Sequence, residues 1–85
     1  MSTNAAAETG PLIPEWSLGD RFRKVRRITG LSQAEFAQRL GTNQKTYAAW
    51  ELDTTAPRNP VAVAKRIEAF AGVPAGWMLG LNSPS

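Results

Sequence analysis

Apolar residues recur along most of the chain at the three- and four-residue spacings of helices. The first such stripe begins after Ser17, a favourable N-cap, and stops at Gly30. Its members are Leu18, Phe22, Val25 and, close to the same line, Ile28. No segment alternates apolar and polar residues with the period of two that strands show. The pattern therefore predicts an all-α fold.

A second helix is predicted over residues 32–40. Ser32 and Glu35 have the spacing of a capping box, in which each side chain accepts a hydrogen bond from the other residue's backbone. Leu31 before the cap and Phe36 after it stand at hydrophobic-staple spacing. The start of this helix is therefore specified locally.

A third helix is predicted over residues 43–51, with Tyr47 and Trp50 on its inner face. Only two or three residues, including Gly41, separate it from the helix before it. Helices that are this short and this close cannot lie antiparallel, so we expect them to cross at a large angle, as in a helix-turn-helix. The crossing requires a small residue where the helices touch, and Ala37 is placed there.

Two further helices complete the predicted bundle of five. Asn59 and Pro60 form a cap and a first-turn proline, and Gly72 follows as a stop. The inner stripe of that helix is Val61, Ala64, Ile67, Phe70 and Ala71. A short last helix, residues 74–79, is expected to bring Trp77 and Leu79 onto the core. All three tryptophans are expected in that core, which is Trp16, Trp50 and Trp77 with Phe22, Phe36, Leu40, Ile67 and Phe70.

The 85 residues suit one domain, which we place at residues 16–81. Residues 1–15 contain Gly10, Pro11 and Pro14 and are expected to form a flexible arm. Residues 82–85 are a short tail. Residues 16–81 hold all ten basic residues but only five of the seven acidic ones, a net charge of +5. A basic small domain suits a polyanionic partner such as nucleic acid.

The chain has no Cys and no His, so the commonest metal ligands and the commonest general base are missing. We therefore expect no cofactor, no metal site and no enzymatic activity. No signal peptide or membrane span is visible in the sequence.

The run LSQAEFAQRLGTNQKTYAAWE resembles the Cro/repressor-type (lambda-repressor-like, XRE) helix-turn-helix family. The resemblance covers about residues 16–81. The segments PEWSLGDRFRKVRR and GVPAGWMLG further resemble small Cro-like and immunity-repressor proteins of actinobacterial phages. The resemblance implies a compact five-helix DNA-binding domain. Asp53 stands where the family often has Gly after its third helix, so that turn is expected to differ.

The resemblance also implies roles for individual residues. The helix over residues 43–51 would enter the major groove and contact bases through Gln44, Lys45, Thr46, Ala48 and Ala49. The DNA backbone would be contacted by Gln33, Asn43, Arg58, Arg23 and Arg27. Gln33 would also brace the helix that contacts bases. Arg26 and Glu51 match the family positions of a structural ion pair between the first and third helices.

The function that these expectations favour is a sequence-specific transcriptional regulator that binds double-stranded operator DNA in the bacterial cytoplasm. A weak homodimer through Trp77, Met78 and Leu79 of the last helix is one expectation for its binding mode, and a monomer is the other. Three alternatives stay open: an antitoxin, an excision-type DNA-binding factor, and a protein-interaction module that keeps the fold without binding DNA.

Overall fold

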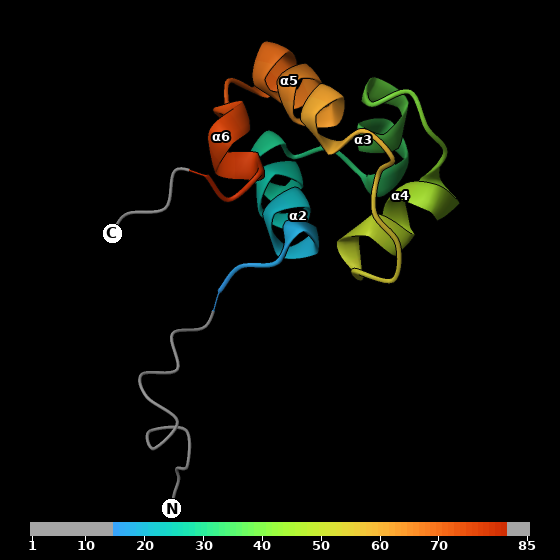
Figure 1. Ribbon diagram of the computed structural model, residues 1–85. Coiled ribbons are helices and arrows are strands. Elements are labelled where there is room, and N and C mark those ends of the chain that lie inside the picture. The colour runs from blue at the N-terminus through green and yellow to red at the C-terminus, as the bar shows by residue number, and fades with distance from the viewer. Residues whose placement is uncertain (1–14, 82–85) are drawn as a thin grey trace, which may run out of the picture.

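Residues 15–81 are described by the structure, a computed structural model, and they form five helices (Figure 1). The helices are α2 (Leu18–Thr29), α3 (Gln33–Arg39), α4 (Gln44–Glu51), α5 (Pro60–Ala71) and α6 (Ala75–Met78). Helix α2 lies between α6 and α4, and α5 runs across the top of the view toward α3. This range contains no strand, so the predicted all-α fold of five helices is confirmed.

The structure covers only part of the predicted division of the chain. The arm predicted at residues 1–15 lies outside the described residues except for Glu15, which is exposed. The tail predicted at residues 82–85 also lies outside them. Among the helices of residues 15–81, none has both the length and the apolar character needed to cross a bilayer.

Helix boundaries follow from side chains that cap the backbone. Ser17 before α2 and Ser32 before α3 each form a full capping box with the acidic residue three positions later. Asn43 and Asn59 cap α4 and α5, each accepting a hydrogen bond from a first-turn N–H. The predicted boundaries are therefore right to within about a residue.

The core is a cluster of aromatic rings filled in by aliphatic side chains. Phe22 of α2 contacts Tyr47 and Trp50 of α4, with ring centroids 5.7 and 5.6 Å apart. Phe36 of α3 contacts Tyr47 and Phe70 of α5, at 5.3 and 5.5 Å. Such pairs each add about 1 kcal/mol beyond the area they bury. The other buried members are Val25, Ala37, Leu40, Ala64, Ile67 and Met78.

Two residues predicted on inner stripes face solvent instead. Ile28 is 64% exposed, because it lies in the last turn of α2, after Leu18, Phe22 and Val25 have made the core contacts of that helix. Val61 is 47% exposed, because it lies in the first turn of α5, where Val63 takes the position against the core. Both predictions were wrong because a short apolar stripe does not determine which residues at its end still face the core.

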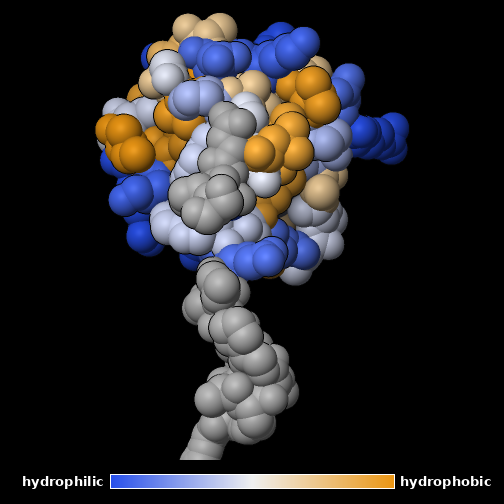
Figure 2. Space-filling view, turned by 60° about the vertical axis from the view of Figure 1, so that its left-hand side comes forward, coloured by the Kyte–Doolittle hydropathy of each residue, from blue (hydrophilic) through white to orange (hydrophobic). Residues whose placement is uncertain are grey.

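Trp16 was also wrongly predicted to be in the core. It is 49% exposed and contacts Trp77 edge-to-face, with ring centroids 5.9 Å apart. Trp77 is half-buried beneath the guanidinium of Arg21, whose Nη1 also donates to the Trp77 carbonyl at 2.7 Å. Figure 2 shows the side of the molecule that lies to the left in Figure 1, where apolar side chains stand among polar ones. Trp16 therefore covers Trp77 from the solvent side, whereas Trp77 and Leu79 pack against the core as predicted.

The turn after α4 is fastened to the start of α2 by Asp53. Its φ of 61° lies in the left-handed region, which explains why glycine is frequent there in the family that the sequence resembles. Its carboxylate accepts from the Gly19 N–H at 2.9 Å and from the Ser17 hydroxyl at 2.6 Å. A Cβ on Gly19 would lie 2.5 Å from the Glu51 carbonyl oxygen, so only glycine allows this approach.

We predict that Asp53→Ala lowers the free energy of unfolding by about 2 kcal/mol or more, because it removes two hydrogen bonds and keeps an unfavourable φ. Asp53→Gly relieves the strain and loses only the bonds, so its loss is smaller. Asp53→Asn tolerates the left-handed backbone and keeps one acceptor, and it should lose least. Urea denaturation of the three variants checks this order, and equal losses would contradict the assignment.

Candidate nucleic-acid interface

The turn between α3 and α4 brings the two helices across each other. Gly41 adopts a φ of 78°, a left-handed conformation that glycine adopts without strain. The Thr42 N–H donates to the Ala37 carbonyl at 3.0 Å and closes the end of α3. Ala37 is wholly buried, as the predicted crossing requires. Figure 1 shows α3 and α4 crossing at a large angle beside α2.

Helix α4 has one buried face and one face directed away from the core. Tyr47, Trp50 and Glu51 are buried, as expected for the first two. Gln44 and Lys45 are exposed. The remaining residues proposed to contact bases, which are Thr46, Ala48 and Ala49, are half-buried, so they form a low surface beside the two long side chains.

Glu51 is only 4% exposed, and its carboxylate is the centre of a buried hydrogen-bond network. Arg26 donates through Nε to Oε2 at 2.6 Å and through Nη2 to Oε1 at 3.2 Å. Gln33 donates through Nε2 to Oε1 at 3.0 Å, and the Tyr47 hydroxyl donates to Oε2. The predicted ion pair is therefore present, and it joins α2, α3 and α4 at one carboxylate.

The network determines the protonation states of its members. Burial would raise the pKa of Glu51, but hydrogen bonds from Arg26, Tyr47 and Gln33 outweigh it and lower that pKa below its ordinary value. Burial, together with the hydrogen bond to Glu51 and its charge, raises the pKa of Tyr47. Glu51 is thus an anion and Tyr47 a neutral donor at neutral pH.

Gln33 lies at the first position of α3, where it braces α4 through Glu51. The sequence assigned this residue both a brace and a phosphate contact, and the structure contains the brace. Tyr47 was assigned only to packing. Its hydroxyl has a structural role that a pattern of apolar positions does not reveal, because an aromatic residue fits the stripe with or without a polar atom.

An open groove of about 500 Å³ runs beside α4, between that helix and the segment before α5. Arg58 and Lys45 both line it and are both exposed. Pro57 is buried, so this segment lies against the domain. The remaining lining residues are Thr46, Ala49, Trp50, Thr55 and Ala56. Two cations therefore flank an otherwise uncharged groove next to the outward face of α4.

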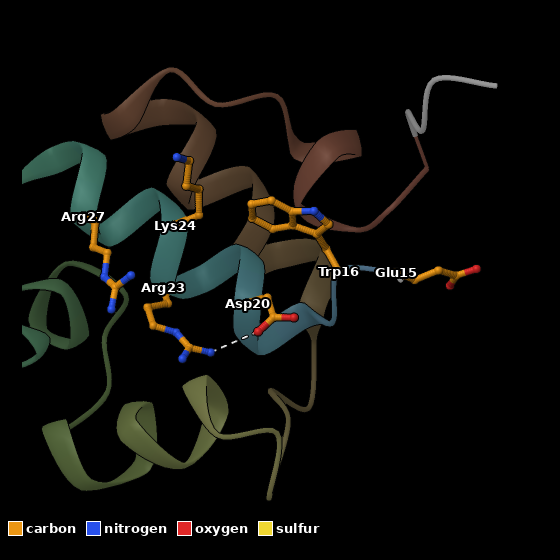
Figure 3. A pocket seen from close by; sticks show the side chains of 6 residues that line it. All are labelled: Glu15, Trp16, Asp20, Arg23, Lys24 and Arg27. Atoms are coloured by element: carbon orange, nitrogen blue, oxygen red, sulfur yellow. Dashed lines mark hydrogen bonds and ion pairs between the residues drawn. The ribbon is translucent and has the colours of Figure 1, made fainter. Parts of the chain in front are cut away.

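The basic residues of α2 divide between two sides of the helix (Figure 3). Arg23 and Arg27 extend toward the side on which α4 lies, and Lys24 extends to the other side. Arg23 pairs with Asp20 at 3.0 Å and is also 3.5 Å from the Glu51 carbonyl oxygen. Arg27 is exposed, and among the described residues nothing forms an ion pair or hydrogen bond with its side chain. Of these two, Arg27 is the better placed for an external anion.

Asn43 is committed to α4 itself. Its Oδ1 accepts from the Thr46 N–H at 2.8 Å, so the side chain is already used as the helix cap. Only its amide N–H groups remain for a phosphate oxygen. The proposed backbone contacts lie at four places: the start of α3, the start of α4, the loop at Arg58, and the side of α2 at Arg23 and Arg27.

A comparison with protein families finds one match for this chain. The family is described as a helix-turn-helix domain, and its model matches residues 19–84, which is most of the chain. Neither the comparison with curated proteins nor that with solved structures gives a match. The match begins within α2 and includes both helices that cross at Gly41.

We predict that Arg26→Met lowers the free energy of unfolding by about 3 kcal/mol, because it removes the charge partner of a buried carboxylate. Arg27→Met is the matched control, one position along the same helix but exposed, and it should change stability by no more than about 0.5 kcal/mol. Urea denaturation measures both. Similar losses in the two variants would mean that the ion pair of Arg26 with Glu51 adds no stability beyond that of an exposed arginine on the same helix.

Acid should weaken the domain partly through Glu51. Since its folded pKa lies below the value in an unfolded chain, near 4.5, its contribution is complete above that pH and is lost as the pH falls through the folded pKa. We predict that Glu51→Gln is clearly less stable than the parent at about pH 6. The difference between their free energies of unfolding should narrow toward about pH 3. The pKa values of Asp20 and Glu35 are also lowered, so the parent-minus-variant difference is the quantity to measure. A gap that is constant with pH contradicts the role given to the carboxylate.

Proposed function

The chain belongs to the helix-turn-helix domain family, and from this we propose that it is a sequence-specific DNA-binding transcriptional regulator. In this proposal α4 enters the major groove of operator DNA and contacts base edges. Gln44 suits adenine, to which it can donate and accept at once, and Lys45 suits the acceptor atoms of guanine. Thr46, Ala48 and Ala49 add close contacts from the low surface beside them.

One observation supports this proposal most. Helix α4 is fixed from behind by the buried Glu51 network, while Gln44 in its first turn and Lys45 on its outward face are exposed. Any surface helix has a buried and an exposed face. In α4, polar hydrogen bonds from two other helices also fix the orientation, as a helix that contacts bases needs while its polar side chains stay available.

The positions of the cations support binding to the DNA backbone. Arg58 and Lys45 flank the groove on one side of α4, and Arg27 extends from α2 toward α4. Phosphate contacts from such positions would set the depth and register of the helix in the groove. Gln33 would add a contact from the start of α3. We assign Arg23 a smaller part, because Asp20 already neutralises it.

Within this function we favour the type that the sequence resembles, a compact phage repressor or Cro-like protein acting in a bacterial cytoplasm without catalytic activity. Such regulators bind inverted repeats as dimers, with half-sites about one helical turn apart. Met78 is 1% exposed and is therefore excluded from the dimer contact expected of the last helix. The exposed apolar residues Trp16 and Leu81 are better candidates, together with the half-buried Trp77 and Leu79.

The test compares two variants that should fail differently. Gln44→Ala removes a base contact, so we predict a loss of about tenfold in the ratio of operator to random-sequence affinity. Arg58→Ala removes a phosphate contact, so it should weaken binding to both DNAs alike and reduce the slope of log affinity against log salt by about 1. In vitro selection of bound DNA supplies the operator, and fluorescence anisotropy at several salt concentrations supplies the affinities.

The outcomes separate the candidate functions. Enrichment of a palindromic site supports a dimeric regulator, and a single half-site supports a monomer. If selection enriches no sequence and binding does not depend on salt, the protein is an interaction module with this fold. If Gln44→Ala keeps full selectivity, the helix contacts DNA through other residues.

A further inference from the structure

The outward face of α4 ends in an apolar surface. Lys45, Ala48, Ala49 and Leu52 stand at positions i, i+3, i+4 and i+7, the spacing at which residues share one helix face. The first of them is the cation assigned to the major groove, and the three that follow have hydrocarbon side chains. Lys45, Ala48 and Ala49 are already assigned to base contacts, and Leu52 is not.

Leu52 is the unusual member of this face. It is the C-cap of α4 with right-handed helical angles, φ −91° and ψ −1°, and its N–H donates to the Ala48 carbonyl at 3.2 Å. The helical path therefore continues through it, and its side chain stays on the outward face. It is 70% exposed, the only large apolar side chain of α4 that is exposed to this extent. Nothing in the packing of the domain requires a leucine here.

The surroundings of Leu52 suit a polyanionic partner. Its nearest acidic neighbours in the sequence, Glu51 and Asp53, are both engaged by donors from the region of α2. Lys45 lies on the same face, and Arg58 lies across the adjoining groove. An exposed apolar side chain two turns from Lys45 on the same helix face fits the major groove, where phosphates flank base edges that themselves include a methyl group.

We propose that Leu52, with Ala48 and Ala49, contacts the 5-methyl groups of thymines and so helps to determine which DNA is bound. This inference rests on the proposed function, since it places α4 in the major groove. Thymine is the only standard base that presents a methyl group there. Removing one such group from water against Leu52 is worth a factor of about four in affinity.

Deoxyuridine in place of thymine tests the proposal, because it deletes the methyl group and leaves base pairing unchanged. Each thymine of the selected operator is replaced singly, and the affinity of the full chain is measured for each DNA. For the parent protein we expect a loss of about fourfold at one or more positions. For Leu52→Ala we expect that loss to shrink to less than about twofold at the same positions.

Ile28→Ala is the matched control, because Ile28 is an aliphatic residue of similar exposure, 64%, on α2. It should keep the full sensitivity to deoxyuridine. Thermal unfolding of both variants checks that they fold like the parent.

Three results would overturn the proposal. The first is that deoxyuridine weakens DNA binding by the parent and by Leu52→Ala equally. The second is that Leu52→Ala weakens binding to operator and to random DNA by the same factor, which would place the side chain on the sugar–phosphate backbone. The third is that Leu52→Ala leaves all DNA binding unchanged, which would assign this face to a protein partner. In each case selection still enriches an operator, whereas failure of the proposed function shows as no enrichment at all.

Discussion

The arrangement of three helices depends on the need of one buried carboxylate for hydrogen-bond donors. A carboxylate as inaccessible as that of Glu51 would be strongly destabilising without partners. The donors come from Arg26 on α2, Gln33 on α3 and Tyr47 on α4 itself. Because each donor must lie within hydrogen-bond distance at the same time, few relative positions of the three helices are allowed. Apolar packing alone, being non-directional, would permit more.

The aromatic residues of α4 are part of the same arrangement. Tyr47 and Trp50 are the two large side chains on the inner face of α4, and Phe22 contacts both rings. A buried tyrosine also needs a partner for its hydroxyl, and Glu51, one turn later on the same helix, supplies it. The buried tyrosine hydroxyl and the buried carboxylate therefore satisfy each other's hydrogen-bonding needs, and either group buried alone would be less stable.

How much the sequence predicted depends on how local each cause is. The caps at Ser32 and Asn43 act within one helical turn, and the helices begin where those residues predicted. The ion pair of Glu51 was predicted because a resemblance supplied the missing long-range information. The Asp53 contact with Gly19 joins residues 34 positions apart, so no periodicity reveals it. Periodicity does not reveal the exposure of Trp16 either, because that exposure depends on the position of Trp77 in α6.

The internal network also explains how α4 can carry an unusual outer face. The donors to Glu51 are all supplied by this chain, so the orientation of α4 depends on no residue of its outward side. Lys45, Ala48 and Leu52 contribute little packing, and substitutions there should leave the fold intact. Base preference can therefore change by replacement of outward residues alone. An exposed leucine at the end of such a face carries no structural benefit that offsets its contact with water, and the proposed contact with DNA would supply one when DNA is bound.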